Sequence, residues 1–147
     1  NVEYKEYEYR LFTQRPLPFA ARFGWWPEMY AAQFDAQMFE KTLQLFVGTH
    51  DFTAFSKDEP GRERVRAVDA ITVSVAGDVV KTIIRGKGFL RYQIRRMIGA
   101  AIMAASQTEV SAGMIAHALA HPHDDPTHML LNADARGLCL QKIMYTE

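Results

Sequence analysis

The stretch that decides the fold is Gly86-Lys87-Gly88-Phe89-Leu90-Arg91-Tyr92-Gln93-Ile94-Arg95-Arg96-Met97-Ile98-Gly99. It predicts the end of a strand, a tight glycine turn and, from near Phe89, the first turns of an apolar helix. Apolar residues recur at helical spacing from here onward: Leu90, Ile94, Ile98, Ala101, Ile102 and Ala105. This stripe is typical of a helix that packs on a sheet.

The same stretch crowds cations at the start of the predicted helix. Helix N-termini carry partial positive charge, so cations there are unfavourable unless an anion faces them. Arg91 and Arg95 would lie one turn apart on one helix face, with Arg95 at the edge of the apolar stripe. Arg96 would point away, toward solvent or a ligand. Because a partly buried arginine needs a carboxylate or phosphate partner, we expect an anion in front of this junction.

Composition predicts one globular domain spanning residues 1–147, with 48% hydrophobic and 23% charged residues. The net charge is zero, so overall attraction does not indicate a nucleic-acid binder, although basic residues cluster at 57–66 and 85–96. The single cysteine, Cys139, excludes an internal disulfide and is expected to be a buried apolar residue. It suits an intracellular, reducing compartment, first the cytoplasm, with the nucleus and mitochondrion as alternatives. No apolar run approaches the ~20 residues of a membrane-spanning helix, so no membrane partner is predicted.

Periodicity elsewhere predicts strands at residues 4–12, 68–75, 79–84 and 137–145, with a hairpin turn at Gly77-Asp78. On the first strand Tyr7, Tyr9 and Leu11 share one face. Asp35 is expected to cap a helix that Gly48 ends, and Ser111 to cap a shorter one. This order predicts an α+β fold, a mostly antiparallel sheet with helices packed on one face. The opposite face would be free for a ligand or a second domain.

Three further segments leave alternatives open. The aromatic loop from Phe19 to Tyr30 could pack against a neighbouring layer, stack on bases, or form a large interface with a missing domain or with a second copy of the chain. The segment 49–56 reads as a polar and aromatic turn in which Asp51 makes turn hydrogen bonds. The cluster from His121 to His128 holds metal-ligating residue types, but its two prolines keep it irregular, so no metal site is predicted.

Five separated motifs resemble the C-terminal half of the TruA family of tRNA pseudouridine synthases. They are Lys5-x-Tyr7-x-Tyr9, the Gly48–Phe55 turn, the Arg62–Val68 lead-in to a strand, the Gly88–Gly99 junction and the closing Ala135–Leu140 strand. They occur in the family's order and cover essentially the whole chain. Each motif alone is weak evidence, whereas five in register are strong evidence.

The resemblance implies isomerisation of uridine to pseudouridine in tRNA, typically in the anticodon stem-loop, with no cofactor. The family's essential aspartate lies in an R-T-D-x-G-V-H-A motif of the N-terminal half, which this sequence does not contain. Asp51 aligns with another motif and is not assigned that role. The chain is therefore expected to supply the C-terminal wall of the cleft and a tRNA-binding surface, with an N-terminal half as partner, and to be inactive alone. The alternative is a non-catalytic RNA-binding or assembly module.

The resemblance also implies site residues. Arg95 would hold the absent aspartate ionised and oriented, or else pair with a structural carboxylate or phosphate. Tyr7 would stack on the target base and assist proton transfer from C5, Leu138 would line the uracil pocket, and Phe89 would support it. For Tyr7 and Leu138 the alternative is simple packing. Phosphate contacts, or ordinary solvated charges, are expected at Lys57, Arg62, Arg64, Lys87, Arg91 and Arg96. No role transfers to Tyr92 or Gln93.

Overall fold

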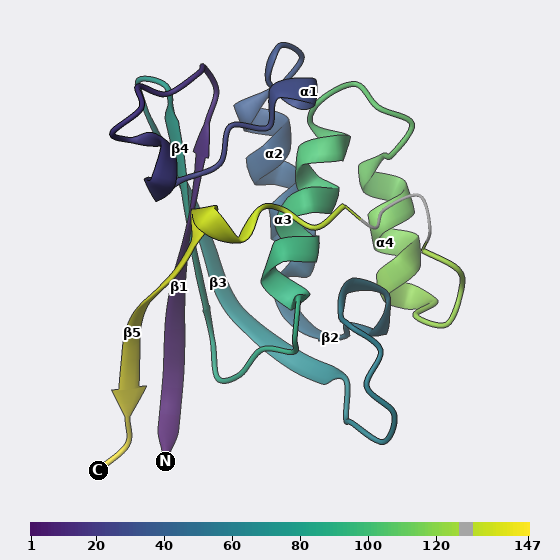
Figure 1. The fold of residues 1–147 in the computed structure, drawn as a ribbon. Coiled ribbons are helices and arrows are strands. Elements are labelled where there is room, and N and C mark those ends of the chain that lie inside the picture. Colours follow the sequence, from purple (N-terminus) through teal and green to yellow (C-terminus); the bar gives the residue numbers. More distant parts are fainter. Residues whose placement is uncertain (127–130) are drawn as a thin grey trace.

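A computed structural model describes residues 1–126 and 131–147. It contains a five-stranded antiparallel sheet in the order β2-β3-β4-β1-β5, with the longer helices on one face (Figure 1). The strands are β1 (Val2–Phe12), β2 (Gly48–Asp51), β3 (Val65–Ala76), β4 (Val79–Gly86) and β5 (Leu138–Tyr145). The helices are α1 (Glu28–Ala31), α2 (Ala36–Leu43), α3 (Gln93–Ala104) and α4 (Ala112–Ala120). The predicted α+β class is confirmed.

Strand β1 organises the sheet because it pairs with β4 on one side and β5 on the other. The β3–β4 hairpin forms as predicted, and the two chain ends lie side by side (Figure 1). The segment 49–56 differs from the expected turn. Its first residues form the edge strand β2 on β3, followed by a 3₁₀ turn, Thr53–Phe55. A four-residue strand is too short for its period of two to stand out in the sequence.

Both predicted helix caps are confirmed. The Asp35 side chain accepts hydrogen bonds from the backbone N–H groups of Gln37 and Met38, and Ser111 accepts one from Met114. Helix α2 ends at Leu43 rather than at Gly48, because a 3₁₀ turn, Gln44–Phe46, follows it. Each cap satisfies backbone donors that the helix itself leaves unpaired.

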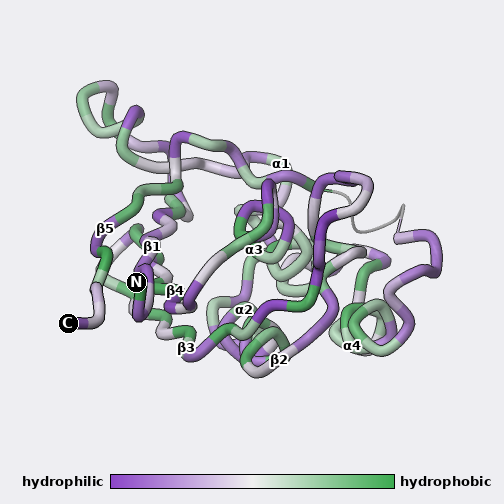
Figure 2. The backbone as a smooth tube through the Cα atoms, turned by 90° about the horizontal axis from the view of Figure 1, so that it is seen from below, coloured by the Kyte–Doolittle hydropathy of each residue, from purple (hydrophilic) through white to green (hydrophobic). Residues whose placement is uncertain are grey.

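The core lies between the sheet and the helices. Tyr9, Leu11 and Ile84 of the sheet belong to this core, together with the apolar stripe of α3. Figure 2 shows the two layers from below, with hydrophobic stretches in both. No helix in residues 1–126 and 131–147 combines the length and hydrophobicity needed to cross a membrane.

Helix α3 begins later than predicted. Its first residue is Gln93, and Tyr92 before it has φ of 67°, a left-handed conformation that non-glycine residues seldom adopt. The Leu90 N–H donates to Oε1 of the buried Gln93 side chain at 2.9 Å, which closes a turn ahead of the helix. Arg91 therefore precedes the helix, and the prediction that Arg91 and Arg95 share one helix face is wrong.

Cys139 also differs from expectation. It lies on β5, an edge strand, and its side chain is exposed rather than buried. Strand alternation decides this, because Leu138 faces the helix layer and the next residue must face the opposite side. The flanking leucines suggested burial, but an edge strand has too few neighbours to cover both faces.

The chain returns to the sheet by crossing α3 at Gly99. A Cβ atom added there would lie 1.9 Å from the Leu131 carbonyl oxygen, so only glycine allows this approach. From this crossing the segment 131–137 runs over α3 to the start of β5 (Figure 1). Gly99 thus sets where β5 begins.

We predict that Gly99→Ala lowers the free energy of unfolding of the full-length protein by about 2 kcal/mol, because the added methyl group must push the crossing segment away. The matched control is Gly113→Ala in α4, where the nearest contact of the new Cβ would be 3.7 Å away. That change should be neutral or stabilising by about 0.5–1 kcal/mol, since alanine is the better helix former. Urea denaturation measures both, and equal effects of the two changes would contradict the close crossing.

Candidate functional site

Four residues assigned by resemblance meet in one pocket of about 250 Å³. Tyr7 comes from β1, Phe89 from the turn after β4, Arg95 from the first turn of α3 and Leu138 from the start of β5. Between 82 and 131 positions separate Tyr7 from the others along the chain, so the fold itself assembles this group. Their shared location fits a common site.

Tyr7 and Phe89 form the aromatic side of the pocket. Their ring centroids are 5.5 Å apart with the planes at 88°, a T-shaped contact. Phe89 reaches this position because it packs on Gly86, where an added Cβ would lie 2.9 Å from the Phe89 Cζ atom. The absence of a side chain at Gly86 therefore lets the Phe89 ring pack closely against the end of β4. The result is a wall of two rings set at a fixed angle.

Arg95 is fixed by the backbone at one end of its guanidinium. Its Nε donates to the Ala133 carbonyl oxygen at 2.6 Å, and the Ala133 N–H donates back to the Arg95 carbonyl oxygen at 3.1 Å. Among residues 1–126 and 131–147, no carboxylate forms an ion pair with Arg95 and no hydrogen bond engages its two terminal nitrogens. An arginine held in this way presents two oriented donors to an incoming anion.

Asp134 interacts electrostatically with Arg95, but its carboxylate is hydrogen-bonded to another residue, Arg136. Its carboxylate accepts from Nε and Nη2 of Arg136 at 3.2 and 3.1 Å. Hydrogen bonds from Arg136 hold the pKa of Asp134 below its usual range. The Asp134 carbonyl oxygen accepts from the Tyr9 hydroxyl, and burial raises the pKa of Tyr9, so this phenol stays protonated. The Asp134 carboxylate is thus paired with Arg136 and forms no ion pair with Arg95.

The Tyr92 ring is surrounded by cations. The four cationic groups lie 5.4 to 5.8 Å from its centroid and belong to Lys57, Arg91, Arg95 and Arg96. Such cation–π contacts hold charged side chains near an aromatic face. The Lys57 N–H donates to the Arg91 carbonyl oxygen at 2.9 Å, which brings the 57–64 loop to the pocket. Positive charge therefore concentrates at the pocket mouth although the chain has no net charge.

The six predicted phosphate-contacting residues fall into two groups. Lys57, Lys87, Arg91 and Arg62 have exposed side chains, although Arg62 lies 3.6 Å from Glu59. Arg64 is largely covered and donates to Asp58 and to the Glu59 carbonyl oxygen, both at 3.0 Å. Their RNA contacts stay predictions.

Arg96 is the second covered residue of the six, and the expectation that it points away from the fold is wrong. Its Nη1 donates to the Ser56 carbonyl oxygen at 2.6 Å and its Nε to Asn132 Oδ1 at 3.3 Å. Burial lowers the pKa of Arg96. The local pattern could not show this, because both partners are at least 36 positions away. Arg96 braces α3 against two loops.

Sequence reasoning missed the residues that support the pocket. Gln93 is fully buried and closes the turn before α3, and Gly137 packs so closely on Tyr9 that an added Cβ would lie 2.5 Å from its ring. One signal was present in the sequence. Gln93 is a polar residue one turn before Met97 on the buried face of α3, and a buried polar side chain must bond to something nearby.

Two other segments singled out in the sequence, the turn at Asp51 and the His121–His128 cluster, lie outside this pocket. Asp51 Oδ1 accepts from the Thr53 N–H at 2.9 Å, which confirms the predicted turn role. In the described part of the His121–His128 cluster, and throughout residues 1–126 and 131–147, no three metal-ligating side chains gather. Thr127 and His128 lie outside the described residues.

The fold and the pocket define an α+β domain that holds an arginine, with two unengaged donors, beside an aromatic wall. A family model described as tRNA pseudouridine synthase matches residues 42–146, more than half of the 147 residues. The chain belongs to the tRNA pseudouridine synthase family.

Curated relatives agree with this assignment. The chain is 31% identical to tRNA pseudouridine synthase A of Mesoplasma florum, over 99% of this chain and 58% of the relative. It is 29% identical to the protein of that name from Thermodesulfovibrio yellowstonii, over 99% of this chain and 59% of the relative. The Pyrobaculum calidifontis relative is 37% identical over 76% of this chain and 42% of its own length. The chain thus spans under three fifths of the length of these relatives.

The two arginines at positions 91 and 96 give a matched test of the site. We predict that Arg96→Ala lowers the free energy of unfolding of the full-length protein by about 2 kcal/mol, because it removes charge-assisted hydrogen bonds to the Ser56 carbonyl oxygen and the Asn132 amide oxygen. Arg91→Ala removes an equal charge from an exposed position and should change stability by less than about 0.5 kcal/mol. Thermal and urea denaturation measure both, and a stable Arg96→Ala protein would show that the brace is dispensable.

Proposed function

We propose that this chain forms the C-terminal half of the active-site cleft of a tRNA pseudouridine synthase. One observation carries the proposal: Tyr7, Phe89, Arg95 and Leu138, matched to the family by three separate motifs, line a single pocket. At about 250 Å³ the pocket is smaller than the ~300–1,000 Å³ of sites for drug-sized ligands. It suits one pyrimidine ring.

The proposed reaction is an isomerisation, so its atoms balance without a co-reactant. The bond from C1′ of the ribose to N1 of uracil breaks, and a bond from C1′ to C5 forms. The C5 proton leaves and N1 gains a proton. The pocket would contribute the Tyr7 ring as a stacking surface for the detached base and its hydroxyl as a proton-transfer group, with Leu138 on the apolar side.

Arg95 would orient the carboxylate that starts the reaction. Its terminal nitrogens are unengaged in the described part of the chain, and a facing guanidinium lowers a carboxylate's pKa and fixes it through two parallel hydrogen bonds. The proposal assigns that carboxylate to a segment outside this sequence, in keeping with the length of the relatives. The cations around Tyr92 would hold phosphates of the tRNA. Homodimer formation through the aromatic loop stays a prediction.

We expect full-length protein to form pseudouridine in unmodified tRNA transcripts, measured by mass-resolved nucleoside analysis. Arg95→Ala should lower kcat by at least about a hundredfold, because it removes the orientation of the charged catalytic group. Tyr7→Phe keeps the ring and loses the hydroxyl, so it should lower kcat by about a hundredfold with little change in KM. The isolated residues 1–147 should be inactive.

The matched control is Arg22→Ala, which removes an exposed arginine that does not line the Tyr7–Arg95 pocket and should leave kcat unchanged. Turnover by residues 1–147 alone would place the catalytic carboxylate inside this chain and overturn the assignment of Arg95. A full-length protein that binds tRNA but modifies none would support the non-catalytic RNA-binding alternative instead.

A further inference from the structure

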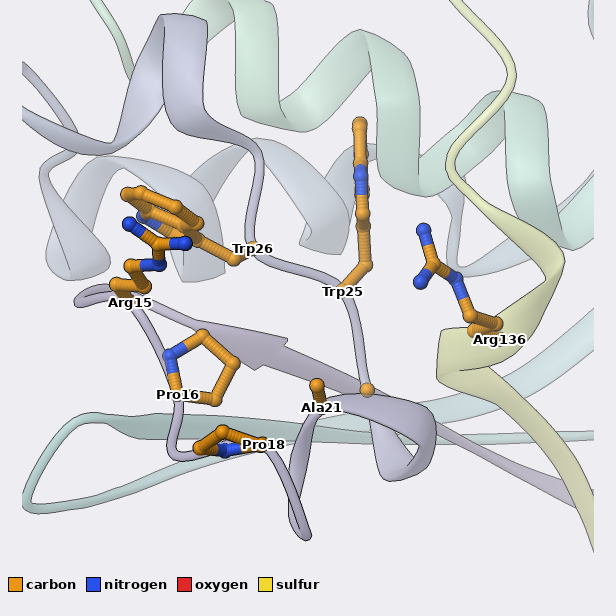
Figure 3. Close-up of a pocket in the computed structure, with 8 residues that line it drawn as sticks. Arg15, Pro16, Pro18, Ala21, Trp25, Trp26 and Arg136 are labelled. Atoms are coloured by element: carbon orange, nitrogen blue, oxygen red, sulfur yellow. The ribbon is translucent and has the colours of Figure 1, made fainter.

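A second cavity, larger than the Tyr7–Arg95 pocket, lies outside it. Its volume is about 460 Å³, and it opens between the loop after β1 and the 3₁₀ turn Ala135–Gly137. Figure 3 shows Arg15 and Trp26 on one side, Trp25 standing between, and Arg136 on the other side. Pro16 and Pro18 form part of the floor. No residue of this cavity has a role in the proposed reaction.

Backbone hydrogen bonds to β1 hold the chain in place at Trp25. The Phe12 N–H donates to the Trp25 carbonyl oxygen at 2.8 Å, and the Trp25 N–H donates to the Arg10 carbonyl oxygen at 3.0 Å. This segment therefore extends the sheet beyond the end of β5 and fixes the cavity wall. Trp25 and Trp26 are both half-buried, so each keeps part of its ring exposed. Rigid, partly exposed aromatic rings are stacking surfaces for planar groups.

The cations at the cavity differ in how far their charges are neutralised. The Arg15 guanidinium lies over the Trp26 ring, 5.9 Å from its centroid, and forms no ion pair with any residue in the described ranges. Arg136 is held in a fork by the Asp134 carboxylate, which offsets its charge and fixes its plane. An anion would therefore be favoured at Arg15. Arg136, whose charge is offset by Asp134, lines the cavity with a guanidinium plane of fixed orientation. A cation beside stacking surfaces suits a nucleotide, with its planar base and its phosphate.

The cavity and the Tyr7–Arg95 pocket lie on the same short stretch of chain. Arg136 lines the first and Leu138 lines the second. Two residues of extended chain span at most about 7 Å, so neighbouring nucleotides of one strand could occupy the two sites. An apolar protein segment fits less well, because it would leave the Arg15 charge without a partner.

We propose that the cavity lined by Arg15, Trp25, Trp26 and Arg136 binds a second nucleotide of the RNA, next to the uridine in the Tyr7–Arg95 pocket. The base stacks on the indole rings and the phosphate lies at Arg15. This inference rests on the proposed function for the identity of the RNA. It adds to that function a binding site that would select RNA with an unpaired nucleotide beside the target.

The test measures binding of unmodified tRNA transcripts to full-length protein by filter retention over a range of salt concentrations. Trp26→Ala and Trp26→Leu should weaken binding about tenfold, whereas Trp26→Phe, which restores a stacking ring, should remain within about threefold of wild type. Arg15→Ala should weaken binding and reduce the slope of log K against log salt by about one. Controls on the same loop are Arg22→Ala and Phe19→Ala, an exposed cation and an exposed aromatic residue outside the cavity.

Binding by Trp26→Leu and Arg15→Ala that equals that of the two controls would overturn the proposal. So would a lowered melting temperature of Trp26→Ala with unchanged tRNA binding, because the cavity would then hold another part of the protein. Pseudouridine formation is measured in parallel to separate the two hypotheses. Inactive wild type with Trp26-dependent binding would reject the enzyme and keep the nucleotide site, whereas active wild type with Trp26-independent binding would reject the site alone.

Discussion

Arg95 and Ala133 are joined by two hydrogen bonds that run in opposite directions, and the rest of the site depends on this connection. The guanidinium Nε donates to the Ala133 carbonyl oxygen, and the Ala133 N–H donates to the Arg95 carbonyl oxygen. One turn further along α3, Gly99 lets the same segment pass at close range. These contacts hold the segment from Leu131 to Ala133 in one position across α3.

Two consequences follow from the fixed segment. It uses one nitrogen of Arg95, and no hydrogen bond within residues 1–126 and 131–147 engages the other two, although Arg95 lines the pocket. It also determines where the 3₁₀ turn Ala135–Gly137 and β5 begin, and these place Arg136 at one cavity and Leu138 at the other. Tyr9 and Gly137 secure the far end of the segment through the Asp134 carbonyl oxygen and close ring packing. The same few contacts therefore position both sites.

The sequence predicted those features that depend on local patterns. Alternation of polar and apolar residues predicted β1, β3 and β4, and short polar side chains predicted the helix caps at Asp35 and Ser111. The residues of the apolar stripe from Leu90 to Ala105 are all buried, as expected. The start of α3 was misplaced because a left-handed Tyr92 is not expected from composition. Arg96 and Cys139 were misjudged because their surroundings come from distant segments and from the edge position of β5. Motif resemblance, rather than periodicity, grouped the pocket residues.

The most direct measurement is a crystal structure of the full-length protein bound to an unmodified tRNA. Our account predicts a uracil ring in contact with Tyr7 and Leu138, and a carboxylate from outside residues 1–147 within hydrogen-bonding distance, about 3 Å, of the Arg95 terminal nitrogens. A target base bound elsewhere, with the Arg95 terminal nitrogens facing solvent or another structural group, would contradict it.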